Sequence, residues 1–216
     1  MIKCPLTGST NVKIIYEQKS VPLIQNKVYA TKEQAVNAPC IDVILAQSLH
    51  NGFVFSANFN ESIIDYDAAY QNEQSNSVYF RQHLEHVIEI MRNNNTLNGK
   101  VVEIGCGKAY FLEMLLDRGV NITGFDPTYE GHSPKVVKDF FSDKHFDIGA
   151  EFIILRHTLE HIAHPFNFIK TIAAANKHKG KIYIEVPTFD WITAHNATED
   201  IFYEHCNYFT LATLQM

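Results

Sequence analysis

The chain has 216 residues, with 18 basic and 24 acidic side chains and a formal net charge of −6. This length is enough for one full domain and a small appendage around a substantial core. The acidic balance argues against a broad binding surface for nucleic acid or anionic lipid. No run approaches the roughly 18 apolar residues of a membrane helix, and the start of the chain lacks a signal-peptide pattern. The four cysteines have no paired spacing, which favours reduced thiols. We therefore expect a cytosolic protein with a small-molecule partner, and leave its oligomeric state open.

Residues 1–60 are predicted to form a small strand-rich unit. Short apolar runs, VKIIY at 12–16 and GFVFSANF at 52–59, are separated by proline breakers. Residues 61–98 differ, because a polar and aromatic stretch precedes a segment with apolar residues at helical spacing. We predict a linker there, followed by an amphipathic helix whose inner face is formed by Leu84, Val87, Ile88 and Met91.

From residue 99 to 216, strand-like segments alternate with helix-like ones. KVVEI, NITGFD, KVVKD, EFIILR and KIYIEV are apolar and short, and FLEMLLDRG and FNFIKTIAAANK have helical patterns. This alternation predicts an α/β fold with a parallel, Rossmann-like sheet and crossover helices. Only the 29 residues 188–216 follow the fifth strand and Pro187, too few for the helix and two strands that usually complete such a sheet. We therefore expect the closing strands to be missing.

A glycine turn joins the first of these strands to a helix in VVEIGCGKAYFLEML. Gly105 and Gly107 allow a ligand to approach the backbone closely. A dinucleotide fingerprint would need its third glycine at position 110, where Tyr110 stands, so NAD is disfavoured. S-adenosylmethionine has no pyrophosphate and carries a cationic sulfonium, which suits an acid placed early in the turn, as Glu103 is.

Further acidic residues follow the next two strands. Asp126 lies 21 residues beyond Gly105, where a carboxylate can accept hydrogen bonds from both ribose hydroxyls. Asp139 and Phe140 offer an acid for an exocyclic amine and an apolar neighbour for an adenine ring. With Arg156 at the end of the fourth strand, they make up the predicted cofactor side. The alternative is that these acids merely cap helices.

These motifs, together with LRHTLEHIAHPFNFI and YIEVP, resemble the class I SAM-dependent methyltransferases over about residues 100–187. FYEHCNYFT and AAYQNEQSNS resemble, more narrowly, the sugar C-methyltransferases of deoxysugar and surface-polysaccharide pathways. The resemblance implies S-adenosylmethionine as cofactor and a sugar or sugar nucleotide as acceptor. Methylation of oxygen or nitrogen stays open. It also implies contacts with the cofactor's methionine end by Glu103, Gly105 and Gly107, with its ribose by Asp126, and with its adenine by Asp139 and Phe140.

The acceptor side is expected to contain His161, Glu204 and His205. Methyl transfer from a sulfonium is an in-line displacement, so the enzyme aligns the acceptor and removes a proton where the acceptor needs it. The resemblance implies that His161 borders cofactor and acceptor, and that His205, beside Glu204, takes a proton from a carbon next to a keto group. A neutral imidazole suits that task near pH 7.

A tyrosine of the resembled family's Tyr-x-Glu-His pattern is replaced here. Its position falls on Phe202, and the hydroxyl group nearest in sequence belongs to Tyr203. Enolate stabilisation by that tyrosine is therefore in doubt. Tyr70, in the aromatic linker, is predicted to contact the acceptor.

The resembled sugar methyltransferases bind zinc in their small N-terminal unit through paired CxxC motifs. Here CPLT has Thr7 at the position of the second thiolate, and Cys4, Cys40 and His50 supply at most three of the four ligands of structural zinc. We expect no metal in this protein.

Two rival interpretations remain. HTLEH, residues 157–161, fits the H-x-x-E-H spacing of inverse zinc peptidases, although Pro165 soon interrupts a helix there. The other is a methyltransferase fold that only binds, either as an inactive relative or as a truncated chain. The cofactor motifs favour an active methyltransferase over both.

Overall fold

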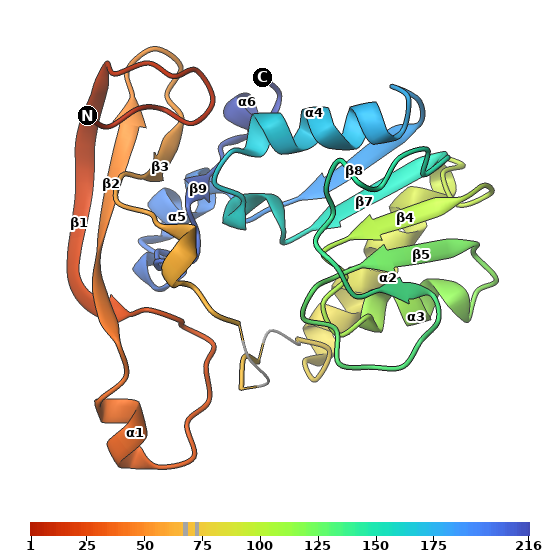
Figure 1. Cartoon of the computed structure of the whole chain (residues 1–216), viewed down its shortest axis with the longest axis horizontal. Coiled ribbons are helices and arrows are strands. Elements are labelled where there is room, and N and C mark those ends of the chain that lie inside the picture. Colours follow the sequence, from red (N-terminus) through yellow and green to blue (C-terminus); the bar gives the residue numbers. More distant parts are fainter. Residues whose placement is uncertain (67–68, 72–73) are drawn as a thin grey trace. The chain divides into compact units, whose positions relative to one another are not determined.

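The computed structural model describes residues 1–66, 69–71 and 74–216 (Figure 1). Its contacts divide the chain into two compact units. Unit 1 comprises residues 1–71, 157–167 and 186–216, and unit 2 comprises residues 72–156 and 168–185. Both units are thus built from segments that are separated in the sequence, whereas the boundaries expected at 60/61 and 98/99 divide the chain into consecutive blocks.

Unit 1 contains a four-stranded antiparallel sheet in the order β1-β2-β3-β9 (Figure 1). Three of its strands come from the predicted strand-rich region: β1 (Val12–Pro22), β2 (Cys40–Ser48) and β3 (Val54–Ser56). The fourth, β9 (Asn207–Tyr208), comes from the C-terminal segment and pairs with β3. A strand from the end of the chain therefore joins the N-terminal sheet.

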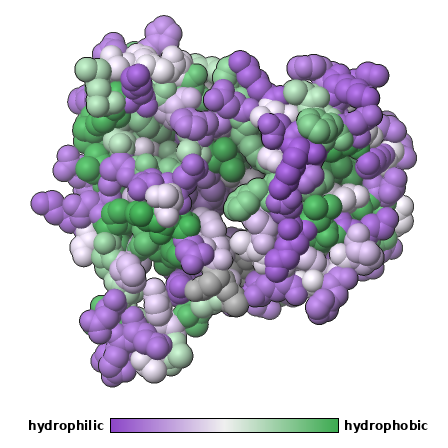
Figure 2. All heavy atoms as spheres, in the orientation of Figure 1, coloured by the Kyte–Doolittle hydropathy of each residue, from purple (hydrophilic) through white to green (hydrophobic). Residues whose placement is uncertain are grey.

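The core of unit 1 is formed by both ends of the chain. Its buried cluster includes Val43 and Leu45 from β2 together with Tyr203 and Tyr208 from the C-terminal segment. The remaining short helices of this unit are α1 (Lys32–Val36), η1 (Glu61–Ile63), η2 (Leu159–His161), α5 (Phe189–His195), η3 (Thr198–Asp200) and α6 (Leu211–Leu214). Helix α1 buries none of its residues, and Figure 2 shows a hydrophilic surface around it at the lower left.

Unit 2 contains a five-stranded parallel sheet in the order β6-β5-β4-β7-β8. Its strands are β4 (Val101–Ile104), β5 (Ile122–Phe125), β6 (Val136–Val137), β7 (Phe152–Arg156) and β8 (Lys181–Glu185). Helices α2 (Val78–Asn93), α3 (Tyr110–Leu116) and α4 (Pro165–Ala175) accompany them, the first three residues of α4 belonging to unit 1. The strand order reverses between β4 and β7, as in doubly wound α/β folds. This topology confirms the predicted Rossmann-like fold class.

The amphipathic helix predicted before the sheet is α2. Ser77 caps its first turn by accepting a hydrogen bond from the backbone N–H of Phe80. The buried residues are the four predicted from the helical spacing, and they pack in the core of unit 2. Within the described residues, no helix has both the length and the apolarity of a membrane span.

Close packing of α3 on the sheet depends on Gly124 in β5. A Cβ atom at this position would lie 2.6 Å from Leu112 Cδ1 and 2.7 Å from Cys106 Sγ. The helix therefore approaches the sheet closely despite Tyr110, because the glycine that makes room stands on the neighbouring strand rather than in the turn.

The turn before α3 contains a strained alanine. Gly105, Gly107 and Ala109 all have positive φ angles, of 78°, 54° and 66°. Glycine adopts this region freely, whereas a Cβ atom there costs about 1–2 kcal/mol. Of these three positions, only Ala109 has a Cβ atom, so only Ala109 is strained by its left-handed conformation.

We expect Ala109→Gly to raise the free energy of unfolding by about 1 kcal/mol, because it removes that strain. Urea denaturation of both proteins measures the change. Ala174→Gly, at an exposed position inside α4, is the matched control and should lower stability by about 1 kcal/mol. Destabilisation by both substitutions would contradict the assignment of strain to position 109.

Candidate functional site

The predicted cofactor residues of unit 2 lie at the carboxyl ends of its strands. Glu103 is in β4, the glycine turn follows that strand, and Asp126 follows β5. The backbone N–H of Gly107 donates a hydrogen bond of 2.7 Å to Asp126 Oδ2, so the turn and this acid are in contact. Ligands of open α/β sheets bind at this edge, next to the point where the strand order reverses.

Asp126 also stabilises its own turn. Its Oδ1 accepts hydrogen bonds from the backbone N–H of Thr128 at 2.8 Å and from the Thr128 hydroxyl at 2.7 Å. The residue is 8% exposed, and both carboxylate oxygens already accept hydrogen bonds within the protein. Its role toward ribose therefore stays a prediction, and a test must separate that role from the stabilisation of the turn.

Glu103 is almost completely buried, and its Oε2 has no hydrogen-bond partner among the residues that the structure describes. Burial raises the pKa of this carboxyl group from its ordinary value of 4.5 to about 7. Arg156 opposes the rise, whereas the negative charges of Asp126 and Glu185 add to it. Glu103 therefore changes its charge near neutral pH.

This raised pKa predicts a pH-dependent stability. Because the folded protein holds the proton more tightly than the unfolded chain, Glu103 lowers stability progressively as the pH rises from 4.5 to about 7, and by a constant amount above that. At 1.36 kcal/mol per pKa unit, the loss is about 3 kcal/mol.

We expect Glu103→Gln to remove this loss. Urea denaturation at pH 5 and pH 8 should show that the advantage of the variant over the wild type grows with pH. Glu113→Gln, at an exposed position in α3, is the control and should follow the wild type at both pH values. A constant difference between Glu103→Gln and the wild type would contradict the prediction.

Arg156 belongs to an ion-pair network. Its Nε donates to Glu185 Oε2 at 2.8 Å, and Glu185 Oε1 lies 2.6 Å from His83 Nε2. The guanidinium group is also 4.5 Å from the centroid of the Phe111 ring, a cation–π distance. These contacts link the ends of β7 and β8 to α2 and α3, and the predicted contact of Arg156 with the cofactor remains untested.

Asp139 and Phe140 follow β6 at the surface of unit 2. Asp139 Oδ2 lies 2.6 Å from Lys144 Nζ, and the hydrogen bond from this lysine is the largest cause that lowers the pKa of Asp139. Phe140 is 72% exposed, whereas its neighbour Phe141 is buried against Phe125 at a centroid distance of 5.2 Å. The predicted adenine contacts thus involve an exposed residue, Phe140, and a partly exposed one, Asp139.

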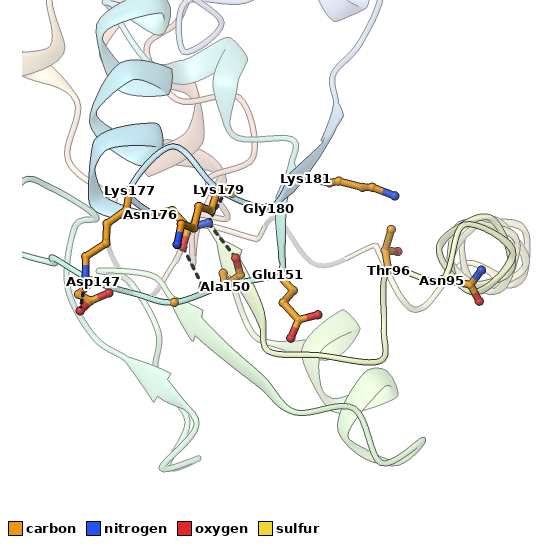
Figure 3. A pocket seen from close by; sticks show the side chains of 11 residues that line it. Asn95, Thr96, Asp147, Ala150, Glu151, Asn176, Lys177, Lys179, Gly180 and Lys181 are labelled. Carbon is orange, nitrogen blue, oxygen red and sulfur yellow. Dashed lines mark hydrogen bonds and ion pairs between the residues drawn. The ribbon is translucent and has the colours of Figure 1, made fainter.

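A cavity of about 660 Å³ lies at the opposite end of the same sheet (Figure 3). Residues near the start of β7 and β8 line this cavity. Among them, Asn176 accepts a hydrogen bond from the Ala150 N–H and donates to the carbonyl groups of Ala150 and Lys179. Lys177 and Asp147 form an ion pair of 2.7 Å beside them. None of the predicted cofactor residues lines this cavity.

In unit 1, the structure brings together three of the predicted acceptor residues, His161, Glu204 and His205. The rings of His161 and His205 meet edge to face, with centroids 4.8 Å apart. His161 Nδ1 lies 3.0 Å from the carbonyl oxygen of Glu204. Glu160 completes the group, because ligand atoms of Glu160, His161 and His205 all lie within 4.8 Å of one another. We call these four residues the acceptor cluster.

Hydrogen bonds between η2 and the C-terminal segment position the acceptor cluster. The backbone N–H of Cys206 donates to the Glu160 carbonyl at 2.9 Å, and Asn207 Nδ2 donates to the Ile162 carbonyl at 2.6 Å. Asn207 is buried and also starts β9, so sheet pairing and cluster geometry depend on the same residue. Sequence reasoning did not single out Asn207, because only the fold shows which carbonyl groups lie near it.

Glu204 is fully buried and only partly hydrogen-bonded. Its Oε2 accepts from the backbone N–H of Gln25 at 2.7 Å, whereas Oε1 finds no partner within the described part of the chain. Burial raises the pKa of Glu204 to about 7, and the bond from Gln25 opposes the rise. Burial lowers the pKa of His161 and lowers that of His205 further, so both imidazoles are neutral at pH 7.

The hydroxyl group of Tyr203 is used inside the fold. It donates to the Asn58 carbonyl at 3.1 Å, accepts from the Asn60 N–H at 2.8 Å, and the residue is fully buried. Phe202, at the tyrosine position of the resembled pattern, packs on His205 with ring centroids 3.9 Å apart. Neither residue offers a phenol to an acceptor.

Two other tyrosines lie in unit 1 near this region. Tyr66 and Tyr70 pack with ring centroids 4.7 Å apart, and Tyr70 forms a β-bridge with Lys27. Burial, followed by the charges of Tyr70 and Glu204, raises the pKa of Tyr66. Sequence reasoning named Tyr70 and missed Tyr66. Positions 68, 72 and 73 of the aromatic segment lie outside the described residues.

The helix required by the peptidase alternative does not form. His157 has a left-handed φ of 49°, and η2 has only three residues, Leu159–His161. His157 and His161 are therefore not one turn apart on a single helix. The H-x-x-E-H interpretation of this segment was wrong, because a left-handed residue separates the strand from the short helix that follows.

The fold and the carboxyl-edge residues of unit 2 define an α/β domain of the class that binds adenosine-containing cofactors. A sequence model of the family described as "Methyltransferase domain" matches residues 77–216. The chain belongs to this family, and its methyl donor is S-adenosylmethionine.

Two solved structures are similar over part of the chain. A SAM-dependent methyltransferase from Archaeoglobus fulgidus has 20% sequence identity and a TM-score of 0.48, over 64% of this chain and 71% of that one. The complex of the Haloferax volcanii Trm112 methyltransferase activator with its proposed methyltransferase has 16% identity and a TM-score of 0.41, over 61% of this chain and 67% of that one. No curated protein matches the sequence.

Proposed function

We propose that this methyltransferase transfers the methyl group of S-adenosylmethionine to a carbon atom next to a keto group of a sugar or sugar nucleotide. The observation that supports this most directly is the acceptor cluster, in which the buried His205 and the partly exposed His161 adjoin the fully buried Glu204. A hydroxyl oxygen has a lone pair and can lose its proton during or after the transfer, whereas methylation of carbon first requires a proton to leave that carbon. A base beside the acceptor is therefore compatible with both reactions and is indispensable before the methylation of carbon.

In the proposed reaction, His205 accepts the proton from the carbon atom, and the electrons of the broken C–H bond form an enolate. The enolate carbon attacks the methyl group in line, so that a C–C bond forms as the S–CH₃ bond breaks and S-adenosylhomocysteine leaves. His161 orients the acceptor, and Glu204 supplies a hydrogen bond through the oxygen that Gln25 leaves unused. Tyr70 contacts the acceptor.

On the cofactor side, we propose that Glu103, Gly105 and Gly107 bind the methionine end of the cofactor and Asp126 its ribose. Asp139 and Phe140 bind the adenine, and Arg156 supports the site through its bond to Glu185. The four cysteines are free thiols, which supports a cytosolic location for the reaction.

The first experiment is calorimetric titration with S-adenosylhomocysteine, which should bind one-to-one with micromolar affinity, about −8 kcal/mol. The second incubates the protein in deuterated water with nucleotide-linked keto sugars and without methyl donor. Deuterium should enter the carbon next to the keto group, and addition of methyl-labelled donor should place the label on that carbon.

Label on oxygen or nitrogen, with no deuterium exchange, would overturn carbon methylation and keep the methyltransferase. Binding of S-adenosylhomocysteine without turnover on any acceptor of the panel would favour the non-catalytic alternative.

A further inference from the structure

The acceptor cluster has the composition of a transition-metal site. Glu160, His161 and His205 offer one carboxylate oxygen and two imidazole nitrogens, all within 4.8 Å of one another. Imidazole and carboxylate ligands suit Zn²⁺, and three protein ligands with one open position are typical of accessible zinc sites. Neither the family assignment nor the proposed reaction calls for a metal here.

The imidazole of His161 is oriented as metal-binding histidines usually are. His161 Nδ1 lies 3.0 Å from the Glu204 carbonyl, so that ring donates Nδ1–H and keeps the lone pair of Nε2. For His161, a backbone carbonyl thus selects the tautomer that a metal ion needs. The ring of His205 lies beside it, with the two ring centroids 4.8 Å apart.

Glu160 provides the second, independent observation. Its side chain is 2% exposed, and its Oε2 lacks a hydrogen-bond partner among the described residues. A buried carboxylate oxygen without a partner is unfavourable, and a cation is one of the few groups that satisfies it. The oxygen belongs to the same residue that completes the group with the two histidines.

The geometry needs only a small contraction. Zinc bonds to nitrogen and oxygen are about 2.1 Å long, which places two tetrahedral ligands about 3.4 Å apart. The ligand atoms of the group lie within 4.8 Å of one another, so rotations about side-chain bonds must bring them together. The two segments that carry the ligands, 160–162 and 205–207, stay in place during these rotations. Cys206 and Asn207 hold them together by donating hydrogen bonds to the carbonyl groups of Glu160 and Ile162. His161 is partly exposed, which gives an ion a route from solvent.

We propose that Glu160, His161 and His205 bind a divalent transition-metal ion, Zn²⁺ in particular, and that the bound ion inhibits methyl transfer. The inhibitory part rests on the proposed function, in which His205 accepts a proton through the nitrogen that the ion would coordinate. The same nitrogen of His205 can therefore bind either the acceptor's proton or a metal ion, but not both at once.

Titration of the whole 216-residue chain, treated with chelator beforehand, with Co²⁺ and followed by visible absorption, tests binding without reference to activity. We expect one ion per chain, an absorption band typical of low coordination, and displacement by Zn²⁺. His161→Ala and His205→Ala should abolish the band, and Glu160→Gln, which keeps the size of the side chain, should weaken binding at least about 10-fold. His195→Ala removes an exposed histidine of the same unit and should leave binding unchanged.

Absence of the band in the wild type, or its persistence in both histidine variants, would overturn the site. Melting curves in chelator show whether each variant is folded, and Glu160→Gln decides the matter if the histidine variants are not. For the inhibitory part, one equivalent of Zn²⁺ should stop turnover without changing the affinity for S-adenosylhomocysteine, and chelator should restore it. Undiminished turnover at full occupancy would overturn inhibition alone. Failure to find any acceptor would count against the proposed function and leave the Co²⁺ result intact.

Discussion

His205→Ala is expected to lower kcat by about 10²–10⁴-fold, the usual contribution of a general base, while the affinity for S-adenosylhomocysteine stays at the wild-type value. The physical reason is that His205 has its ring inside the acceptor cluster, against Phe202 and His161, whereas the proposed cofactor residues belong to the other unit. Turnover and calorimetric binding are measured on the same preparation.

Two further measurements make this prediction specific. Deuterium exchange at the acceptor carbon should disappear together with turnover, and added imidazole should restore part of both if the lost function is proton transfer. His195→Ala, the exposed control in unit 1, should be fully active. An unchanged rate in His205→Ala, or loss of turnover with exchange intact, would contradict the role of His205 as base.

Asp126→Ala is expected to weaken the binding of S-adenosylhomocysteine by about 100-fold or more. A carboxylate that accepts two ribose hydroxyls contributes two hydrogen bonds to a charged group, each about 1.5–3 kcal/mol. Calorimetry measures the loss, and Asp147→Ala, which removes an exposed acid of the same unit, should bind as the wild type does.

Because Asp126 also stabilises its turn, a second variant separates the two roles. Thr128→Val removes the hydroxyl that donates to Asp126 Oδ1 and leaves the carboxylate in place. We expect it to affect binding less than 10-fold. If Thr128→Val were as damaging as Asp126→Ala, the aspartate would act by stabilising the turn rather than by binding ribose.

Local patterns predicted much of unit 2. The four apolar positions of α2 repeat at helical spacing and are buried as expected, and the glycine turn lies between β4 and α3 where the sequence placed it. The parallel sheet followed from the alternation of strands and helices. Such features depend on residues that are near one another in the chain, so their signal survives in a single sequence.

The turn itself was understood only in part. After Gly105 and Gly107, the third residue with a left-handed backbone is Ala109, not Tyr110. The glycine that lets α3 approach the sheet is Gly124, on the neighbouring strand. The left-handed φ of Ala109 could not be predicted, because alanine adopts this conformation only under strain and the residue type does not indicate it. The need for a glycine at position 124 of β5 arises from α3, the helix that follows β4, so nothing adjacent in the sequence indicates it.

By itself, therefore, the sequence determined the class of the fold and the position of the glycine turn, because each has a short-range signature. The cofactor roles at the carboxyl edge of the sheet and the acid–base roles of the histidines stay predictions. Only the tertiary structure decided that β9 joins the N-terminal sheet and that Glu160 and His161 meet Glu204 and His205. It also showed that the Tyr203 hydroxyl is occupied by Asn58 and Asn60. These outcomes depend on which distant segments pair and on which buried polar groups find partners there, and no local pattern records such long-range pairings.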